Sequence, residues 1–173
     1  MSLAFTHLFR LVHIISAVFW TGTVIFLTSF LFPTVKELGP VGGAVMDQLT
    51  RVRRVPTYLT IAGWLTILSG AVLLWADSQA GQADWMRSGP GMTFSIGGLF
   101  ALIAAVLGGV VSGPTAKKLG GIAAAVKAAG GPPSAEQAAQ VQALQGRLTT
   151  TTRVVAALLT LAMAAMAVAR YVP

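Results

Sequence analysis

The sequence predicts an all-α integral membrane protein: a four-helix bundle with a cytoplasmic helical hairpin between its third and fourth helices. Hydrophobic residues make up 55% of the 173 residues and charged residues only 10%, whereas a soluble domain carries about 25% charged residues. Four apolar runs are long enough to cross a hydrocarbon core of ~30 Å at ~1.5 Å per residue. One domain accounts for the whole chain.

Proline and glycine mark the predicted helix boundaries. The first helix, whose only charge is Arg10, is expected to stop before Pro33. Pro56 suits the first position of the second helix, and Gly113-Pro114 is expected to end the third. The four predicted helices span about residues 8–32, 56–76, 92–113 and 150–171.

The third connection is predicted to be a helical hairpin. Residues 117–129 continue the helical pattern, and the Gly-Gly-Pro-Pro run at 130–133 reverses the chain. Ser134 followed by Gln137 fits a capping box, which starts a helix. Apolar residues then recur at helical spacing, so this arm should run straight into the fourth helix.

The basic residues predict the topology. The first and third connections carry nine of them, and the second carries only Arg87. The nine are Lys36, Arg51, Arg53, Arg54, Lys117, Lys118, Lys127, Arg147 and Arg153. The positive-inside rule therefore places these connections in the cytoplasm of a bacterium and both termini outside its inner (plasma) membrane. The net charge of +7 reflects this topology, so no nucleic acid partner is expected.

Small residues recur every four positions along the third helix. They are Gly97, Ala101, Ala105, Gly109 and Gly113. Such a face lets another helix approach closely. It predicts packing inside the bundle, or a homo-oligomer or membrane-complex partner on the same face.

His13 is the strongest candidate functional residue. It lies well inside the first apolar run, where an ionisable side chain is costly unless it has a partner. A neutral imidazole could ligate haem iron or copper, hydrogen-bond a quinone, or simply bond a neighbouring helix. His7 lies near the membrane boundary and points about 120° away around the helix, so the two histidines are not expected to share an ion.

Further candidate ligands lie at the depth of His13. Met163 and Met166 offer thioethers on the fourth helix, and soft sulfur suits Cu(I) or an axial haem position. His13 and Met166 should both sit roughly 8 Å below the outer surface. Arg10 is one turn outward of His13, where it could pair with a haem propionate or another anion. Each also has a structural alternative, namely core packing for the methionines and snorkelling for Arg10.

The run LVHIISAVFWTGTVIFL, with His13, Trp20 and Gly22, resembles the first helix of two families of bacterial membrane proteins. One is the copper-resistance D (CopD-like) type and the other is the HemJ-like protoporphyrinogen oxidases. The segments GPTAKKLGG and MAVARYV resemble an uncharacterised branch of such four-helix proteins. The CopD-like resemblance implies copper handling at the outer face. The HemJ-like resemblance implies a haem ligated by His13 and porphyrin oxidation.

Two functions are predicted. The first is binding of haem b or copper in the outer half of the bundle, for redox or metal handling. It would use His13, Met166, Arg10 and Trp20, with Met163 as a further metal ligand. The second is a non-catalytic structural or accessory subunit of a membrane complex. The chain has no cysteine, which excludes disulfides and thiolate sites. No motif assigns a catalytic residue.

Overall fold

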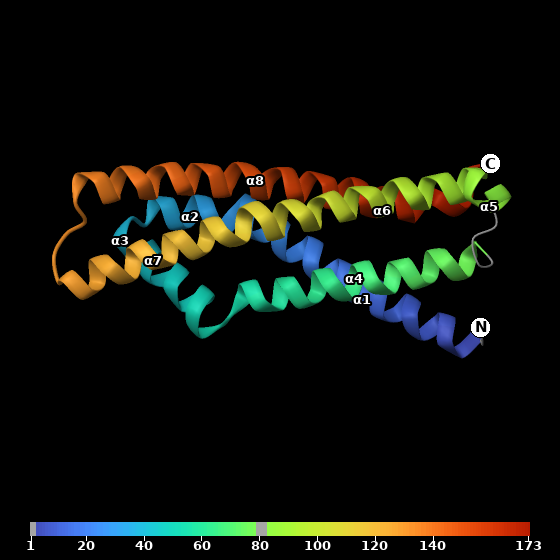
Figure 1. Ribbon diagram of the computed structural model, residues 1–173, viewed down its shortest axis with the longest axis horizontal. Helices are drawn as coiled ribbons and strands as arrows, with labels where there is room; N and C mark the ends of the chain where they lie inside the picture. The colour runs from blue at the N-terminus through green and yellow to red at the C-terminus, as the bar shows by residue number, and fades with distance from the viewer. Residues whose placement is uncertain (1–2, 79–82) are drawn as a thin grey trace.

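The structure is a computed structural model that describes residues 3–78 and 83–173 (Figure 1). In the described residues every regular element is helical. The α-helices are α1 (Leu3–Phe26), α2 (Phe32–Glu37), α3 (Pro40–Asp47), α4 (Val55–Asp77), α5 (Ala83–Arg87), α6 (Gly89–Leu107), α7 (Gly113–Ala129) and α8 (Ala135–Val168). Three π-helical turns, η1 (Leu27–Leu31), η2 (Gln48–Val52) and η3 (Gly108–Ser112), lie between them, and a 3₁₀ turn, η4 (Ala169–Tyr171), follows α8.

Four continuous helical segments are long and apolar enough to cross a membrane, which confirms the predicted all-α, four-helix membrane fold. They cover Leu3–Glu37, Val55–Asp77, Gly89–Ala129 and Ala135–Tyr171. Both chain ends lie at one end of the bundle (Figure 1), here called the terminal end. The opposite end, formed by α2, α3, η2 and the α7–α8 connection, carries most of the basic residues and is called the basic end.

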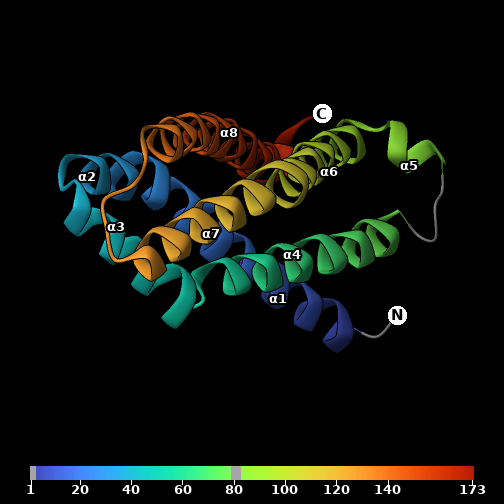
Figure 2. The ribbon, with the colours of Figure 1, turned by 60° about the vertical axis from the view of Figure 1, so that its left-hand side comes forward.

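The bundle consists of two closely packed helix pairs, α1 with α4 and α6 with α8, which make far fewer contacts with each other. Figure 2 shows α1 and α4 together below α6 and α8. The buried core where the pairs meet includes Trp20, Val24, Ala104 and Leu159. Ala104 is completely buried, and its small side chain allows close helix packing at this position.

The predicted helix ends at Pro33 and Pro114 are wrong, because the helix continues through both prolines. Proline lacks an N–H and normally disrupts the i→i−4 ladder. Here each proline follows a π-helical turn, and the N–H groups of Phe32 and Gly113 bond to carbonyls five residues back. A π turn shifts the hydrogen-bond pattern by one residue. The proline then lies in the first turn of the next helix, where its missing N–H is tolerated.

The hairpin at the basic end has the geometry that the sequence predicts. Gly130 has a φ of 67°, the left-handed conformation that ends a helix. The backbone N–H of Gln137 lies 3.2 Å from Ser134 Oγ, and the backbone N–H of Ser134 lies 2.9 Å from Gln137 Oε1. This reciprocal pair is the predicted capping box, and α8 then runs unbroken into the bundle.

Part of the small-residue face of α6 is used inside the chain. Gly97 and Ala101 are buried, and a Cβ on Gly97 would lie 3.2 Å from the Ala162 carbonyl oxygen of α8. Nearer the basic end, Gly109 and Gly113 are exposed. Packing within the bundle therefore accounts for the first half of the face, and the homo-oligomer stays a prediction.

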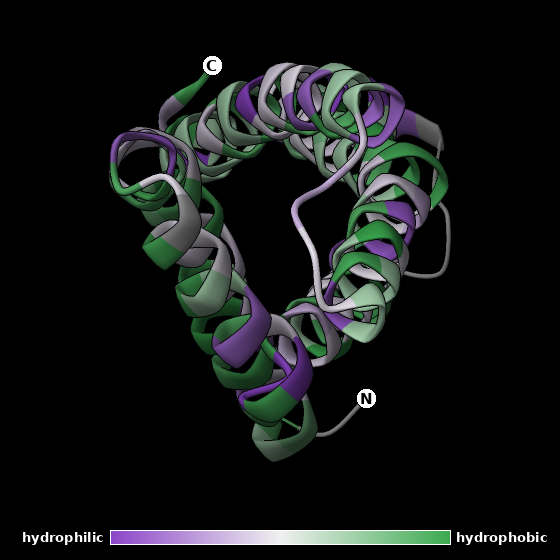
Figure 3. Cartoon of the chain, turned by 90° about the vertical axis from the view of Figure 1, so that its left-hand side faces the viewer, coloured by the Kyte–Doolittle hydropathy of each residue, from purple (hydrophilic) through white to green (hydrophobic). Residues whose placement is uncertain are grey.

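Large apolar side chains cover the outside of the bundle. Phe30, Leu68, Leu102 and Leu161 are each about half exposed or more. Figure 3, viewed from the basic end, shows hydrophobic residues along the shafts of all the long helices. In water such a surface would drive aggregation, whereas a bilayer solvates it. Lipid is therefore the environment that fits this surface.

Candidate functional site

Three residues of α1 face a matching row on α4. Trp20 packs against Gly63, where an added Cβ would lie 3.4 Å from the indole ring. Ser16 Oγ lies 2.9 Å from Thr66 Oγ1 in a buried contact. One step further toward the terminal end, His13 lies against α4. The two helices are antiparallel, so residue numbers fall along α1 as they rise along α4. This register places His13 beside Thr66 and Gly70.

The ring of His13 is held by α4. Its Nδ1 lies 2.9 Å from the Thr66 carbonyl oxygen and 3.3 Å from Ser69 Oγ. A carbonyl oxygen only accepts hydrogen bonds, so Nδ1 must carry the proton. In neutral imidazole the other nitrogen, Nε2, then has the lone pair. A histidine that donates from one nitrogen to a backbone carbonyl and offers the other is the usual arrangement of a metal ligand.

His13, Met163 and Met166 line one small cavity between α1, α4, α6 and α8. Its volume is about 20 Å³, which is enough for a single water-sized guest. Met166 packs against α6 at Gly97, where an added Cβ would lie 3.1 Å from the Met166 Cγ. The structure thus brings together residues that are far apart in the sequence and that were expected at the same depth.

The remaining candidate residues divide between this cavity and the surface. Trp20 lines the cavity and is 6% exposed. Arg10 is half-buried and is not part of the lining. His7 is exposed and lies apart from the cavity, as its angular offset from His13 predicts.

The glycines of α4 are the residues that the sequence argument missed. A Cβ on Gly70 would lie 2.8 Å from His13 Cε1 and 3.1 Å from its Nδ1, so only glycine leaves room for the ring. A signal was present in the sequence. Gly63 and Gly70 are seven residues apart, and so are His13 and Trp20. Seven residues are about two helical turns, so two large side chains on α1 meet two glycines on α4.

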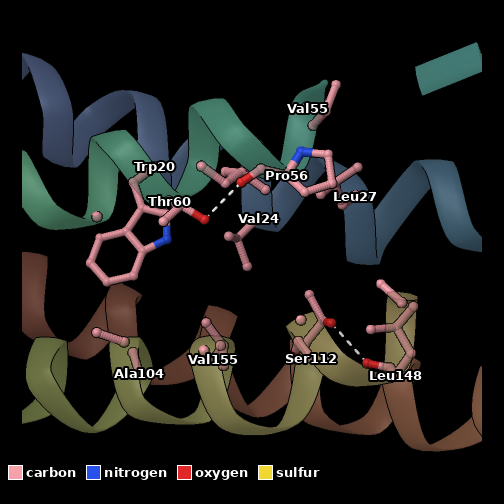
Figure 4. Close-up of a pocket in the computed structure, with 18 of the residues that line it drawn as sticks. Trp20, Val24, Leu27, Val55, Pro56, Thr60, Ala104, Ser112, Leu148 and Val155 are labelled. Atoms are coloured by element: carbon pink, nitrogen blue, oxygen red, sulfur yellow. Dashed lines mark hydrogen bonds between the residues drawn. The ribbon is translucent and has the colours of Figure 1, made fainter. Parts of the chain in front are cut away.

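A second, much larger cavity of about 650 Å³ extends from Trp20 toward the basic end. Figure 4 shows Trp20, Val24 and Pro56 on one wall and Ala104, Ser112 and Val155 on the other. Its lining is overwhelmingly apolar and contains no histidine. Trp20 lines both cavities and therefore stands between them.

In the part of the chain that the structure describes, no three His, Asp or Glu side chains are placed to hold a metal ion together. The nitrogen and sulfur donors that line the small cavity are one imidazole and two thioethers. Comparison with family models, curated proteins and solved structures found no match to this chain.

Proposed function

We propose that this integral membrane protein binds Cu(I) in the terminal half of the bundle, in a metal-handling role like that implied by the CopD-like resemblance. The observation that carries the proposal is the fixed tautomer of His13. With Nδ1–H bound to the Thr66 carbonyl, Nε2 is left with the lone pair, and His13 lines the same small cavity as Met163 and Met166.

The donor set suits Cu(I) among the common metals. Thioether sulfur is a soft ligand that selects Cu(I), and imidazole also binds copper well. Two methionines and one neutral histidine carry no charge. Bound Cu(I) would therefore be the one charge in the site, and no carboxylate would have to be buried in the bilayer. Zn²⁺ and Mg²⁺ favour ligand sets richer in thiolate, imidazole or oxygen.

The size of the cavity favours copper over haem. A volume of about 20 Å³ accommodates one ion, whereas organic cofactors occupy pockets of roughly 300 Å³ or more. The larger cavity has the volume for a macrocycle, but Met46 is the one side chain of its lining that is a usual axial haem ligand. A haem ligated by His13 would therefore require α1 and α8 to separate.

Competition for Cu(I) tests the proposal. The protein, purified in detergent under reducing conditions, is titrated into a chromophoric Cu(I) chelator, and bound copper is quantified by metal analysis. One equivalent of Cu(I) per chain is expected. A protein that takes no copper from the chelator and shows no haem absorption contradicts the proposal and supports the accessory-subunit alternative.

The glycine behind His13 offers a test that leaves all ligands in place. Gly70→Ala puts a methyl group against the imidazole, so the ring must rotate away from the Thr66 carbonyl. Loss of such a supporting hydrogen bond weakens metal binding by about 10- to 100-fold. Chelator competition measures the change. Gly22→Ala is the matched control, because a Cβ at Gly22 meets nothing within 4 Å, and its Cu(I) affinity should equal that of the wild type.

We further propose that the protein lies in a bacterial inner membrane with its basic end in the cytoplasm, as the positive-inside rule indicates. A cysteine placed at Ser134, in the exposed hairpin of the basic end, should react with a membrane-impermeant maleimide only after the cells are opened. A cysteine at Ser2 should react in intact cells. Labelling of the Ser134→Cys variant in intact cells contradicts this orientation.

A further inference from the structure

The large cavity at the basic end is separate from the His13 site and opens sideways to the membrane. Trp64, Leu102 and Val110 line it and are also 62%, 49% and 69% exposed. These residues belong to α4, α6 and η3, so the opening lies between α4 and the continuous α6–η3 helix. At this depth only lipid lies outside. An apolar space that opens into hydrocarbon can be entered by a hydrocarbon chain without exposing either to water.

Ser112, in the cavity wall, has a buried hydroxyl oxygen without a hydrogen-bond partner among the described residues. Most other helical hydroxyls bond to the carbonyl four residues back. Two that also line the cavity are Thr152, bonded to the Leu148 carbonyl, and Thr60, bonded to the Pro56 carbonyl (Figure 4). A buried polar group left unpaired costs free energy. A guest whose polar group met this hydroxyl, after rotation of the Ser112 side chain toward the cavity, would remove that cost.

All three π-helical turns in the described residues border the same cavity. Leu27 and Leu31 come from η1, Leu49 and Thr50 from η2, and Val110 and Ser112 from η3. π turns are rare and frequently occur at functional sites. Their gathering around one cavity sets this end of the bundle apart from the regular α1–α4 and α6–α8 packing.

The edge of the cavity carries unpaired positive charge. Thr50 and Val55 line the cavity, and the residues between them in the sequence are all exposed. Of these, Arg51 pairs with Asp47 at 3.6 Å, whereas Arg53 and Arg54 are exposed and make no ion pair with any described residue. Arg54 also has a φ of 52°, the one positive φ outside glycine in the described chain. Such strain in a bulky residue is typical of functional sites.

We propose that this cavity binds one acyl chain of an anionic phospholipid from the leaflet at the basic end. The chain would lie along Val24 and Ala104 as far as Trp20. The Ser112 hydroxyl would donate to the ester carbonyl, and Arg53 and Arg54 would face the phosphate. The order of these features along the membrane normal is that of a lipid: hydrocarbon, ester, then charge. Ser112 lies eight residues from Ala104, which gives about 12 Å of depth for the chain.

Quenching by brominated lipid tests the site, because bromine quenches indole fluorescence only near contact. Trp20 is 6% exposed and lines the cavity, so it reports on the cavity and not on the surrounding lipid. The full chain is prepared with Trp20 as its single tryptophan (W64F, W75F and W85F) and reconstituted into phosphatidylcholine vesicles that contain phosphatidylglycerol with brominated chains. Trp20 should be quenched. A parallel protein that keeps only Trp75, 57% exposed, should be quenched by any brominated lipid.

A cavity-filling variant with a matched control identifies where the chain lies. Gly108 lines the cavity and a Cβ there meets nothing within 4 Å, so Gly108→Phe should fill the space and abolish quenching of Trp20. Gly98 is equally unobstructed but does not line the cavity, so Gly98→Phe should leave the quenching unchanged. The same two substitutions, made in the protein that keeps only Trp75, should leave its quenching unchanged, which shows that both variants are inserted.

The headgroup is tested by charge. Replacing Arg53 and Arg54 by Gln should reduce the preference for brominated phosphatidylglycerol over brominated phosphatidylcholine by roughly 25-fold, since each basic residue near a surface contributes about fivefold. Equal quenching by the two lipids in the wild type overturns the anionic assignment.

The whole proposal fails if brominated lipid quenches Trp75 but not Trp20. It also fails if Gly108→Phe leaves the quenching of Trp20 intact. Mass spectrometry of the purified protein that finds a stoichiometric quinone or haem, lost in Gly108→Phe, also overturns the lipid assignment.

Discussion

His13→Ala is expected to abolish high-affinity Cu(I) binding while the protein still inserts and folds. His13 supplies the one nitrogen donor of the small cavity, and its Nδ1–H bond to Thr66 sets the lone pair on Nε2. Losing an outer-shell partner of a metal ligand costs about 10- to 100-fold in affinity, so losing the ligand itself should cost more than about 100-fold. Chelator competition and metal analysis measure the loss, and thermal unfolding in detergent shows that the fold remains.

Two further variants make this result specific. His7→Ala should keep the wild-type affinity, since His7 is exposed and lies apart from the cavity. Met166→Leu removes one thioether but keeps nearly the same shape. It should weaken Cu(I) binding by less than His13→Ala does while α6 and α8 stay packed. Full copper occupancy in the His13→Ala protein would refute the site, and the cavity would then be only a packing defect.

The four spans and the hairpin could be predicted because each depends on local chemistry. Length and hydropathy define a membrane span, which the four helical segments confirm. The reversal at Gly130 and the capping box at Ser134 depend on the conformational freedom of glycine and on a side chain three residues from its partner. Such features are encoded within a few residues of sequence, so no knowledge of the tertiary structure is needed.

The helix ends at the prolines could not be predicted, because tertiary packing decides whether a helix breaks. Pro33 and Pro114 would end helices in isolation. In the bundle, both lie just after π turns that border the large cavity, η1 and η3. Continuing the helix keeps the backbone hydrogen bonds satisfied in a medium without water. The prolines are visible in the sequence. The cavity beside each π turn forms only when the four helices pack together, so it cannot be seen in the sequence.

The sequence identified His13, Met163 and Met166 as candidates, which line one cavity, but it did not identify the residues that support His13. His13 and the two methionines were identified from residue type and depth. The partners of His13 on α4 depend on which faces of two helices meet, and one sequence does not specify that. Thr66 acts through its backbone carbonyl, which any residue possesses. Gly70 acts through the absence of a side chain. Neither contribution is visible in residue chemistry alone.

Trp20→Ala is expected to have the largest effect on stability and to merge the two cavities. The indole is 6% exposed, packs against Gly63 and lines both the small and the large cavity. Removing a buried tryptophan costs about 3 kcal/mol or more through lost packing and the void left behind. In a membrane this cost is mainly lost van der Waals contact, because lipid is as apolar as the helix interior. Reversible unfolding of the reconstituted protein measures it.

Two other substitutions test whether the effect of Trp20→Ala depends on the position of Trp20 between the cavities or only on the loss of a large side chain. Trp75→Ala should change the free energy of unfolding by less than about 0.5 kcal/mol, since Trp75 is 57% exposed. Trp20→Phe keeps an aromatic ring against Gly63 and should recover most of the stability. Because the indole lies between the proposed metal ligands and the large cavity, Trp20→Ala should also admit a hydrocarbon chain beside His13 and weaken Cu(I) binding, although no proposed ligand is removed. Unchanged copper affinity in a correctly inserted Trp20→Ala protein would show that the two cavities are independent.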